Sequence, residues 1–156
     1  MLNRIFFLII LGTLTSCSNP QAPDQRSIVE WFFRDYFSQQ PAGIYFLDQS
    51  VFSKVRSSFD DDLFRRIKYS CENDSIEIRR YSEGRIIENA LRDTVTNERG
   101  TWVTLSDLII QNADTIEIGL RTWSAPLAAK GVRYIFAKDR RDQRWHIVDR
   151  KLIWVS

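Results

Sequence analysis

The chain has little histidine, cysteine, methionine, glycine or proline. Its 156 residues include one His, two Cys, one Met, six Gly and four Pro. One histidine and two cysteines exclude a multi-histidine metal centre and a four-cysteine zinc site. The sequence also has no glycine-rich phosphate-binding motif, no G-x-S-x-G and no H-E-x-x-H. The motifs that identify nucleotide-binding proteins, serine hydrolases and zinc proteases are therefore missing, and we expect no catalytic residue, cofactor or metal.

No excess of one charge is present either. The 22 basic and 20 acidic side chains give a net charge of +2, which is far from the basic field that binds a nucleic-acid backbone. We therefore expect no nucleic-acid partner. What the chain does contain is 44% hydrophobic residues, among them 10 Phe, 5 Tyr and 5 Trp. This is enough apolar surface for one core, and the length excludes a multidomain enzyme.

The N-terminal residues have the pattern of a targeting signal. A short positive segment, Met1–Arg4, precedes the apolar run Ile5–Leu11, which is too short to span a bilayer, where about 20 residues are needed. Small residues then lead to a cysteine in Leu14–Cys17, which resembles the lipobox of bacterial lipoproteins. The resemblance implies that the Cys17 thiol receives a diacylglyceryl group, that cleavage follows Ser16 and that the new amine is acylated. An ordinary secretory signal and a buried hydrophobic helix are the alternatives.

This signal predicts the organisation of the chain. We expect a signal peptide at residues 1–16, a lipidated tether at 17–26 and a single domain at 27–156. The tether is polar, contains two prolines and has no apolar periodicity, which is typical of a linker. Ser18 stands where an Asp would resemble the inner-membrane retention signal of enteric bacteria, so the outer membrane is favoured, with the domain on the periplasmic or the surface face. The expected partners are the membrane, through the lipid, and an envelope protein.

Cys71 is the only thiol left once Cys17 is acylated, so no intramolecular disulfide can form. Lys68 and Arg66 lie nearby and could lower its pKa, but no redox motif accompanies it. We therefore expect Cys71 to pack as a small hydrophobic residue.

A first helix is predicted by the capping box Ser27–Glu30. Apolar residues follow at helical spacing, and Pro41 and Gly43 end the helix. We expect this aromatic stripe to pack on a sheet, although such a stripe can also contact a membrane or a partner. The two rows are Ile28, Phe32 and Tyr36, and Val29, Phe33 and Phe37.

The signals between 44 and 91 are mixed. Residues 44–47 fit a short strand or a helical turn, and 60–71 fit a second helix that begins with three aspartates, 60–62. These carboxylates lack the alternating spacing of a calcium loop and suit a helix N-terminus. A short strand is expected at 76–80, whereas the apolar residues between 86 and 91 recur at helical spacing.

Beyond Gly100 the pattern is that of β-strands. Four strands are predicted, at 101–110, 115–123, 132–137 and 145–155, joined by short connections. They form an antiparallel meander whose apolar face the N-terminal helices cover. The predicted fold class is α+β, with helices packed on an antiparallel curved sheet of four or more strands.

This order of elements, ending in a tryptophan-containing strand, resembles the nuclear transport factor 2-like superfamily, a cone-shaped α+β fold. Cystatin-like folds share the layout and are the alternative. The resemblance implies a pocket between sheet and helices, which members use as an active site, as a ligand cavity or as core.

The candidate pocket residues come from the predicted strands. Asp107 lies on the first strand and Tyr134 on the third, while Trp145, His146 and Asp149 lie on the last. His146 and Asp149 are three residues apart, so they point to opposite faces unless a bulge intervenes.

Two classes of function remain. The first is a lipid-anchored, non-catalytic envelope module that binds a protein, a glycan or a small apolar ligand, a class that includes immunity-type inhibitors. The second is a small pocket enzyme of the ketosteroid isomerase or dehydratase type with a carboxylate base. The charged run Lys138–Arg144 could contact anionic lipid, but we expect a solvated turn, because two aspartates dilute its charge.

Overall fold

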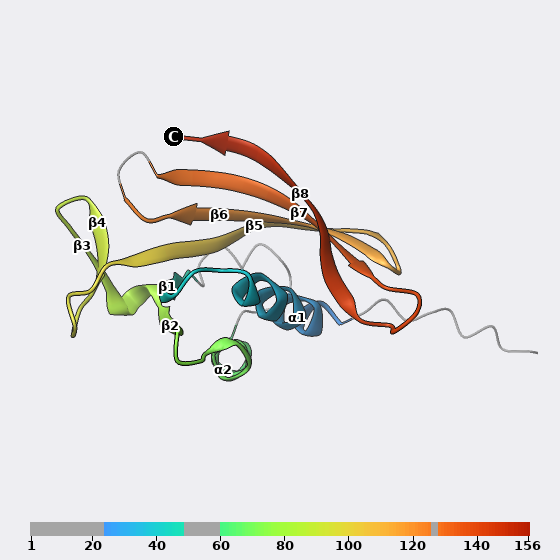
Figure 1. The fold of residues 1–156 in the computed structure, drawn as a ribbon, viewed down its shortest axis with the longest axis horizontal. Helices are drawn as coiled ribbons and strands as arrows, with labels where there is room; N and C mark the ends of the chain where they lie inside the picture. The colour runs from blue at the N-terminus through green and yellow to red at the C-terminus, as the bar shows by residue number, and fades with distance from the viewer. Residues whose placement is uncertain (1–23, 49–59, 126–127) are drawn as a thin grey trace, which may run out of the picture.

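The computed structural model describes residues 24–48, 60–125 and 128–156. In this part of the chain, helices α1 and α2 lie on one face of a curved six-stranded sheet, and a two-stranded sheet lies at one end (Figure 1). The fold class is therefore α+β, as the sequence predicted. The elements are α1 (Gln25–Ser38), β1 (Gly43–Leu47), α2 (Asp61–Cys71), β2 (Ile76–Arg80), the 3-10 helix η2 (Tyr81–Glu83), β3 (Gly84–Ile87), β4 (Ala90–Asp93), β5 (Gly100–Asn112), β6 (Thr115–Trp123), β7 (Ala129–Lys138) and β8 (Trp145–Val155).

The large sheet is mixed. Its strand order is β2-β1-β5-β6-β7-β8. The prediction of an antiparallel sheet is correct for β5 to β8, which pair as a meander. It is wrong for β1, which pairs in parallel with both β2 and β5. The connection through α2 is long enough to bring the chain back to the same end of the sheet, which a parallel pair requires.

Strand β1 is buried on both faces, because a core packs against each side of the sheet at this strand. Tyr45 and Leu47 belong to the main core beneath the helices. Ile44 and Phe46 point to the other face, where they form a second, smaller core with Leu91. This explains why four consecutive residues of β1 are apolar, a pattern that also fitted a helical turn.

Helix α1 begins earlier than predicted. The structure places its first residue at Gln25, with Asp24 as the N-cap, so the expected N-cap at Ser27 is wrong by three residues. The Asp24 carboxylate accepts the Arg26 backbone N–H (3.3 Å) and the Ser27 hydroxyl (3.1 Å). The Ser27 side chain is thus occupied by the true cap.

Aromatic rings fill the space between α1 and the sheet. Phe32 contacts Tyr134 and Phe136 edge-on, with ring centroids 5.4 and 5.7 Å apart. Phe37 contacts Tyr45 at 5.2 Å. All six residues of the two predicted rows of α1 are buried, so the expectation that this stripe packs on the sheet is confirmed.

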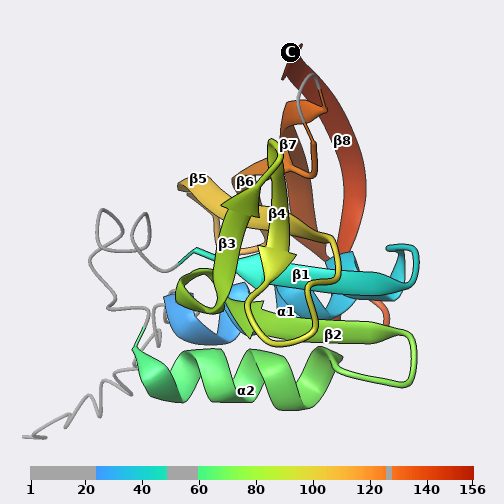
Figure 2. The ribbon, with the colours of Figure 1, turned by 90° about the vertical axis from the view of Figure 1, so that its left-hand side faces the viewer.

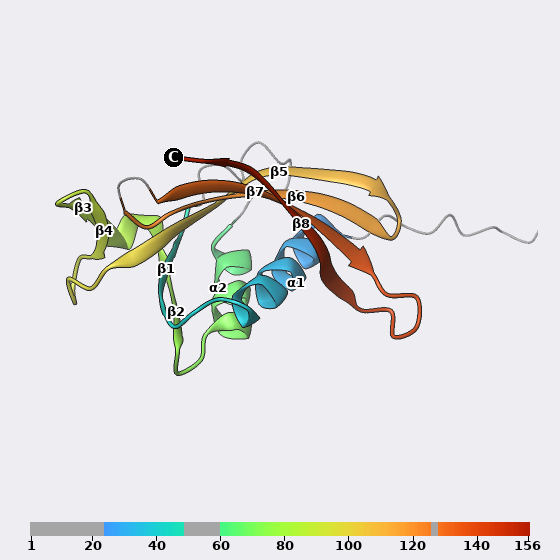
Figure 3. The same cartoon turned by 45° about the horizontal axis from the view of Figure 1, so that its top comes forward.

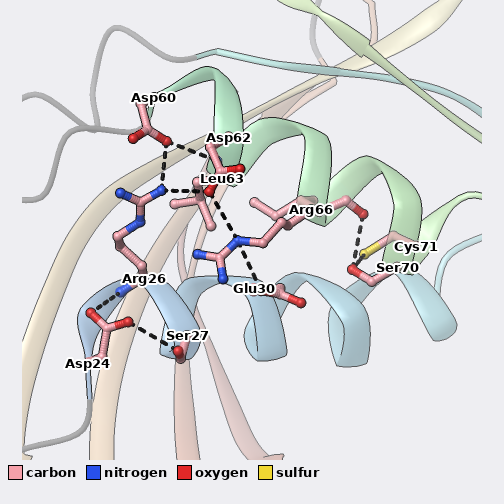
Figure 4. Close-up of polar contacts among 11 residues, drawn as sticks. Asp24, Arg26, Ser27, Glu30, Asp60, Asp62, Leu63, Arg66, Ser70 and Cys71 are labelled. Carbon is pink, nitrogen blue, oxygen red and sulfur yellow. Dashed lines mark hydrogen bonds and ion pairs between the residues drawn. The ribbon is translucent and has the colours of Figure 1, made fainter.

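Helix α2 begins where predicted, with Asp60 as its N-cap. The Asp60 carboxylate accepts the Leu63 N–H at 2.9 Å, which lowers the pKa of Asp60 together with nearby Arg26. Figure 4 shows Arg26 of α1 reaching both Asp60 (2.8 Å) and Asp62 (3.1 Å). The aspartates therefore cap α2 and join it to α1. No group of three or more potential metal ligands occurs in the described ranges.

The segment from residue 84 to 93 is a β-hairpin, so the helical expectation there is wrong. Strands β3 and β4 pair antiparallel. Glu88 and Asn89 make the turn with positive φ angles of 50° and 60°, as a two-residue hairpin loop requires. Figure 2 shows the hairpin at the end of the large sheet, where Leu91 packs on the second core.

Both edge strands of the large sheet are capped by helix side chains. The Glu72 carboxylate accepts the Ile78 N–H of β2 (3.0 Å), and the Lys68 ammonium donates to the Ile78 carbonyl (2.9 Å). On the other edge, the Asp35 carboxylate of α1 accepts the Ile147 N–H of β8 (2.8 Å). These bonds satisfy backbone groups that an edge strand otherwise exposes.

The predicted lipobox and most of the predicted tether lie outside the described residues. Among the residues that are described, no helix is both long and apolar enough to cross a bilayer.

Candidate functional site

A cleft of about 790 Å³ opens between α1 and the turns of two hairpins. Four residues of α1 at helical spacing form its first wall. The β5–β6 turn and the β7–β8 turn form the second wall, and they are joined by the Lys138 N–H, which donates to the Asp114 carbonyl (2.9 Å). The lining residues are Trp31, Arg34, Asp35, Ser38, Ala113, Asp114, Lys138, Gln143, Arg144, Trp145 and His146.

Two tryptophans give the cleft apolar surface. The Trp145 ring stacks on buried Phe136, with centroids 5.4 Å apart. Trp31 is half-buried against the main core. Tryptophan offers both a broad apolar face and an N–H donor, so the cleft is suited to a ligand with a ring or an acyl stem.

Three cations line the same cleft. Arg34, Lys138 and Arg144 form no ion pair with any residue in the described part of the chain. Arg34 and Arg144 are exposed, and such guanidinium groups bind carboxylate or phosphate in a two-pronged geometry. The cleft therefore offers charged donors to an anionic ligand.

Asp35 is largely committed to the fold. Its Oδ2 accepts the Ile147 N–H (2.8 Å) and lies 3.5 Å from the Gln39 amide nitrogen. The same side chain thus holds β8 against α1 and lines the cleft. Asp114 is the other acid in the lining.

The β7–β8 turn is held in a defined shape by its own side chains. The Asp139 carboxylate accepts the Arg141 N–H (2.7 Å), and the Asp142 carboxylate accepts the Arg144 N–H (2.9 Å). A second Asp142 oxygen lies 3.8 Å from His146 Nε2. The aspartates of the charged run therefore shape the turn, and its arginines remain exposed.

The structure brings together two of the four candidate pocket residues. Trp145 and His146 line the cleft. Tyr134 lies in the main core beneath α1, where burial raises the pKa of its hydroxyl. Asp149 is exposed, and its carboxylate accepts the neighbouring Arg150 N–H (2.7 Å). The fifth group considered, Asp107, is exposed on β5 and bonds to Ser106 (3.0 Å).

A bulge at Val148 corrects one expectation. Ile147 pairs with Phe136, and Asp149 pairs with Ile135, so Val148 is an extra residue in β8. His146 and Asp149 therefore lie on the same face of the sheet, and the expectation of opposite faces is wrong. At Asp149 that face is turned away from buried Phe136 and the helices, whereas His146 lies at the start of β8, where the strand borders the cleft.

A smaller hollow of about 400 Å³ lies at the C-terminal end of α1, beside the start of β7. Tyr36 and Tyr45 contribute to its wall, and burial raises the pKa of both hydroxyls. The Tyr45 hydroxyl donates to the Pro41 carbonyl (2.7 Å). Tyrosines in this state stay neutral and serve as hydrogen-bonding groups.

Cys71 is buried at the end of α2, as expected, with 6% of its surface exposed. Burial raises the pKa of its thiol to about 11. The thiolate that reacts with electrophiles or metals is therefore scarce at neutral pH.

The sequence analysis did not predict the wall of the cleft that α1 forms. Trp31, Arg34 and Ser38 follow each other at spacings of three and four, a signal that the sequence does contain. A single aromatic residue on a helix surface is common, so Trp31 alone did not mark this face as a contact surface. The approach of the two hairpin turns to this face depends on the register of the sheet and has no local signal.

Comparisons with protein-family models, with curated proteins and with solved structures gave no match.

Proposed function

We propose that this chain is a lipid-anchored protein of the bacterial cell envelope, with the outer membrane favoured. Cys17 carries the lipid, and the folded domain acts by binding, with its ligand site in the cleft between Trp31 and Trp145. The domain is proposed to be a nuclear transport factor 2-like cone. The support is the order of elements and the placement of both helices on one face of a curved sheet (Figures 1 and 3).

The observation that carries the binding function is the filled interior. The rings of Phe32, Tyr36, Phe37 and Tyr134 occupy the space between α1 and the sheet, where pocket enzymes hold their substrates. A filled interior favours a binding module, because catalysis needs a cavity that excludes water around the reacting groups.

The position of Asp149 also favours binding over catalysis. As the carboxylate base of a pocket enzyme, Asp149 would need to face a desolvated cavity. It is exposed and faces away from the main core. The cleft instead combines Trp31 and Trp145 with the cations Arg34, Lys138 and Arg144, which is a combination suited to recognition.

Binding in the cleft is tested by NMR chemical-shift mapping on the isotope-labelled protein. Solubilised muropeptides and short-chain phospholipids are added in turn, as representatives of envelope glycans and lipids. We expect shifts to concentrate at residues 31–38 and 138–146 and to disappear in Trp145→Ala. The variant Asp149→Asn, at a residue outside the cleft lining, retains the biological role of a binding module. Substrate turnover that is lost in Asp149→Asn, with the fold intact, would establish the pocket enzyme instead.

A further inference from the structure

In Figures 1 and 3 the N-terminal end of α1 points toward the side of the molecule that carries the β5–β6 and β7–β8 turns, and Figure 2 shows that it lies across the molecule from β8. Seven residues lie between Cys17 and Gln25, the first residue of α1, so the path between these two residues is eight residue steps long. Eight residues reach at most about 28 Å when fully extended. If Cys17 holds a lipid, this end of the domain therefore stays near the bilayer.

The same end carries exposed cations. Residues 138–144, here called the basic turn, contain half-buried Lys138 and the exposed residues Arg140, Arg141 and Arg144, and Arg34 of α1 lines the same cleft. None of these five forms an ion pair within the described ranges. The carboxylates of Asp139 and Asp142, both in the basic turn, accept hydrogen bonds from backbone N–H groups of the turn instead.

The acids nevertheless keep the local charge small. Asp35, Asp114, Asp139 and Asp142 oppose the five cations, so the charge of this end alone gives weak attraction to an anionic surface. Weak attraction is sufficient for a tethered domain, because the tether raises the effective concentration of the membrane to the millimolar range. The two tryptophans add to it, since their rings favour the interface between headgroups and acyl chains.

We infer that the cleft binds the phosphate headgroup of an anionic phospholipid in the membrane that holds the anchor. The inference rests on the proposed function, because it needs the lipid at Cys17 and the ligand site in the cleft. The phosphate accepts hydrogen bonds from Arg34 and Arg144, and the glycerol end of the lipid lies against Trp31 and Trp145. The domain is thereby oriented with its C-terminal end, which lies at the opposite end in Figure 1, away from the bilayer.

The test uses the full-length acylated protein, with the acyl groups at Cys17 verified by mass spectrometry. It is reconstituted in vesicles of phosphatidylcholine alone or mixed with phosphatidylglycerol, and hydrogen exchange of backbone amides is measured. We expect exchange in residues 138–146 to slow only with phosphatidylglycerol and to recover at high salt. The double variant Arg34→Gln/Arg144→Gln removes two cations, and we expect it to lower the equilibrium constant for docking on phosphatidylglycerol vesicles by roughly 30-fold.

The matched control is Arg85→Gln/Arg99→Gln. These two arginines are also exposed and form no ion pair in the described residues, and Arg85 lies on β3, at the other end of the molecule (Figure 1). Equal losses in the two double variants would overturn the inference, because they would report net charge only.

Two further outcomes separate the possible causes of failure. Glycerol phosphate is added to the protein in phosphatidylcholine vesicles, and protection equal to that given by phosphatidylglycerol would assign the cleft to a soluble phosphate compound and overturn the membrane source. If the protein is acylated but its backbone amides are not protected on phosphatidylglycerol vesicles, the headgroup inference is wrong and the anchor stands. If mass spectrometry finds no acyl group at Cys17, the anchor is wrong, and the headgroup inference fails with it.

Discussion

Asp93 shows how one buried carboxylate fixes a loop. It is 2% exposed, and its Oδ1 accepts the backbone N–H groups of Thr96 (2.7 Å) and Val95 (2.9 Å). These bonds, with Thr96 the largest cause, hold the pKa of Asp93 below its ordinary value. The other oxygen, Oδ2, has no hydrogen-bond partner among the described residues and lies 3.9 Å from Arg79 Nε.

A lowered pKa makes stability depend on pH. The stabilisation by ionised Asp93 is complete above the unfolded value of about 3.9 and is lost as the pH falls through the lower folded value. We expect the free energy of unfolding, measured in urea, to fall between pH 5 and 3 more steeply in the wild type than in Asp93→Asn. Asp93→Ala costs about 1–3 kcal/mol at neutral pH, because two N–H groups lose their acceptor.

The control for this prediction is Asp139→Asn. Asp139 makes a similar bond to the Arg141 N–H (2.7 Å) but is exposed. The account of Asp93 is wrong if the two Asn variants change the pH dependence equally.

At the scale of elements, α1 carries the main core. Phe33 is fully buried and stacks on Phe37, with ring centroids 5.6 Å apart. Phe33→Ala removes a large core side chain and leaves a cavity, so we expect a loss of about 3–5 kcal/mol in the free energy of unfolding. Chemical denaturation measures this loss. Trp31→Ala, on the cleft face of the same helix, is expected to cost less, and a loss below about 1 kcal/mol for Phe33→Ala would contradict the packing of this stripe.

Elements with one consistent local signal were predictable. Strands β6 and β8 have the predicted bounds, Thr115–Trp123 and Trp145–Val155, because their alternation and flanking turns agree. Helix α1 was predictable from its aromatic rows, but its start was not, because both Asp24 and Ser27 are good N-caps. A tertiary contact favours Asp24 as the N-cap: with the helix starting at Gln25, Arg26 lies in the first turn of α1 and reaches Asp60, the N-cap of α2.

The hairpin of β3 and β4 was not predictable from the pattern. Ile86 and Ala90 are four residues apart, as on a helix, but the structure places them on paired strands around a turn. The turn residues Glu88 and Asn89 include no glycine to mark the positive φ. Packing of Leu91 in the second core stabilises the hairpin instead, and that contact depends on distant strands.

At the scale of the whole molecule, the proposed anchor at Cys17 is the feature to test first. Three acyl chains at Cys17 would hold the protein on a membrane, since each buried methylene contributes about 0.8 kcal/mol. We expect Cys17→Ser to abolish labelling by a fatty-acid probe and to release the protein from the membrane fraction. Buried Cys71 serves as the internal control, because it remains in the variant. Labelling that persists through Cys71, or unchanged membrane association, would contradict the lipoprotein assignment.

The position of β1 in the sheet has a consequence for how the chain reaches its native state. β1 is the first strand to leave the ribosome or a translocation pore, yet its neighbours β2 and β5 begin at residues 76 and 100. Until those segments emerge, its apolar residues have no partner strand, and contacts so distant in sequence form slowly. A nascent chain of this protein therefore has a long interval in which the aromatic helix and β1 are open to misassociation. Release of the complete chain before folding would shorten that interval.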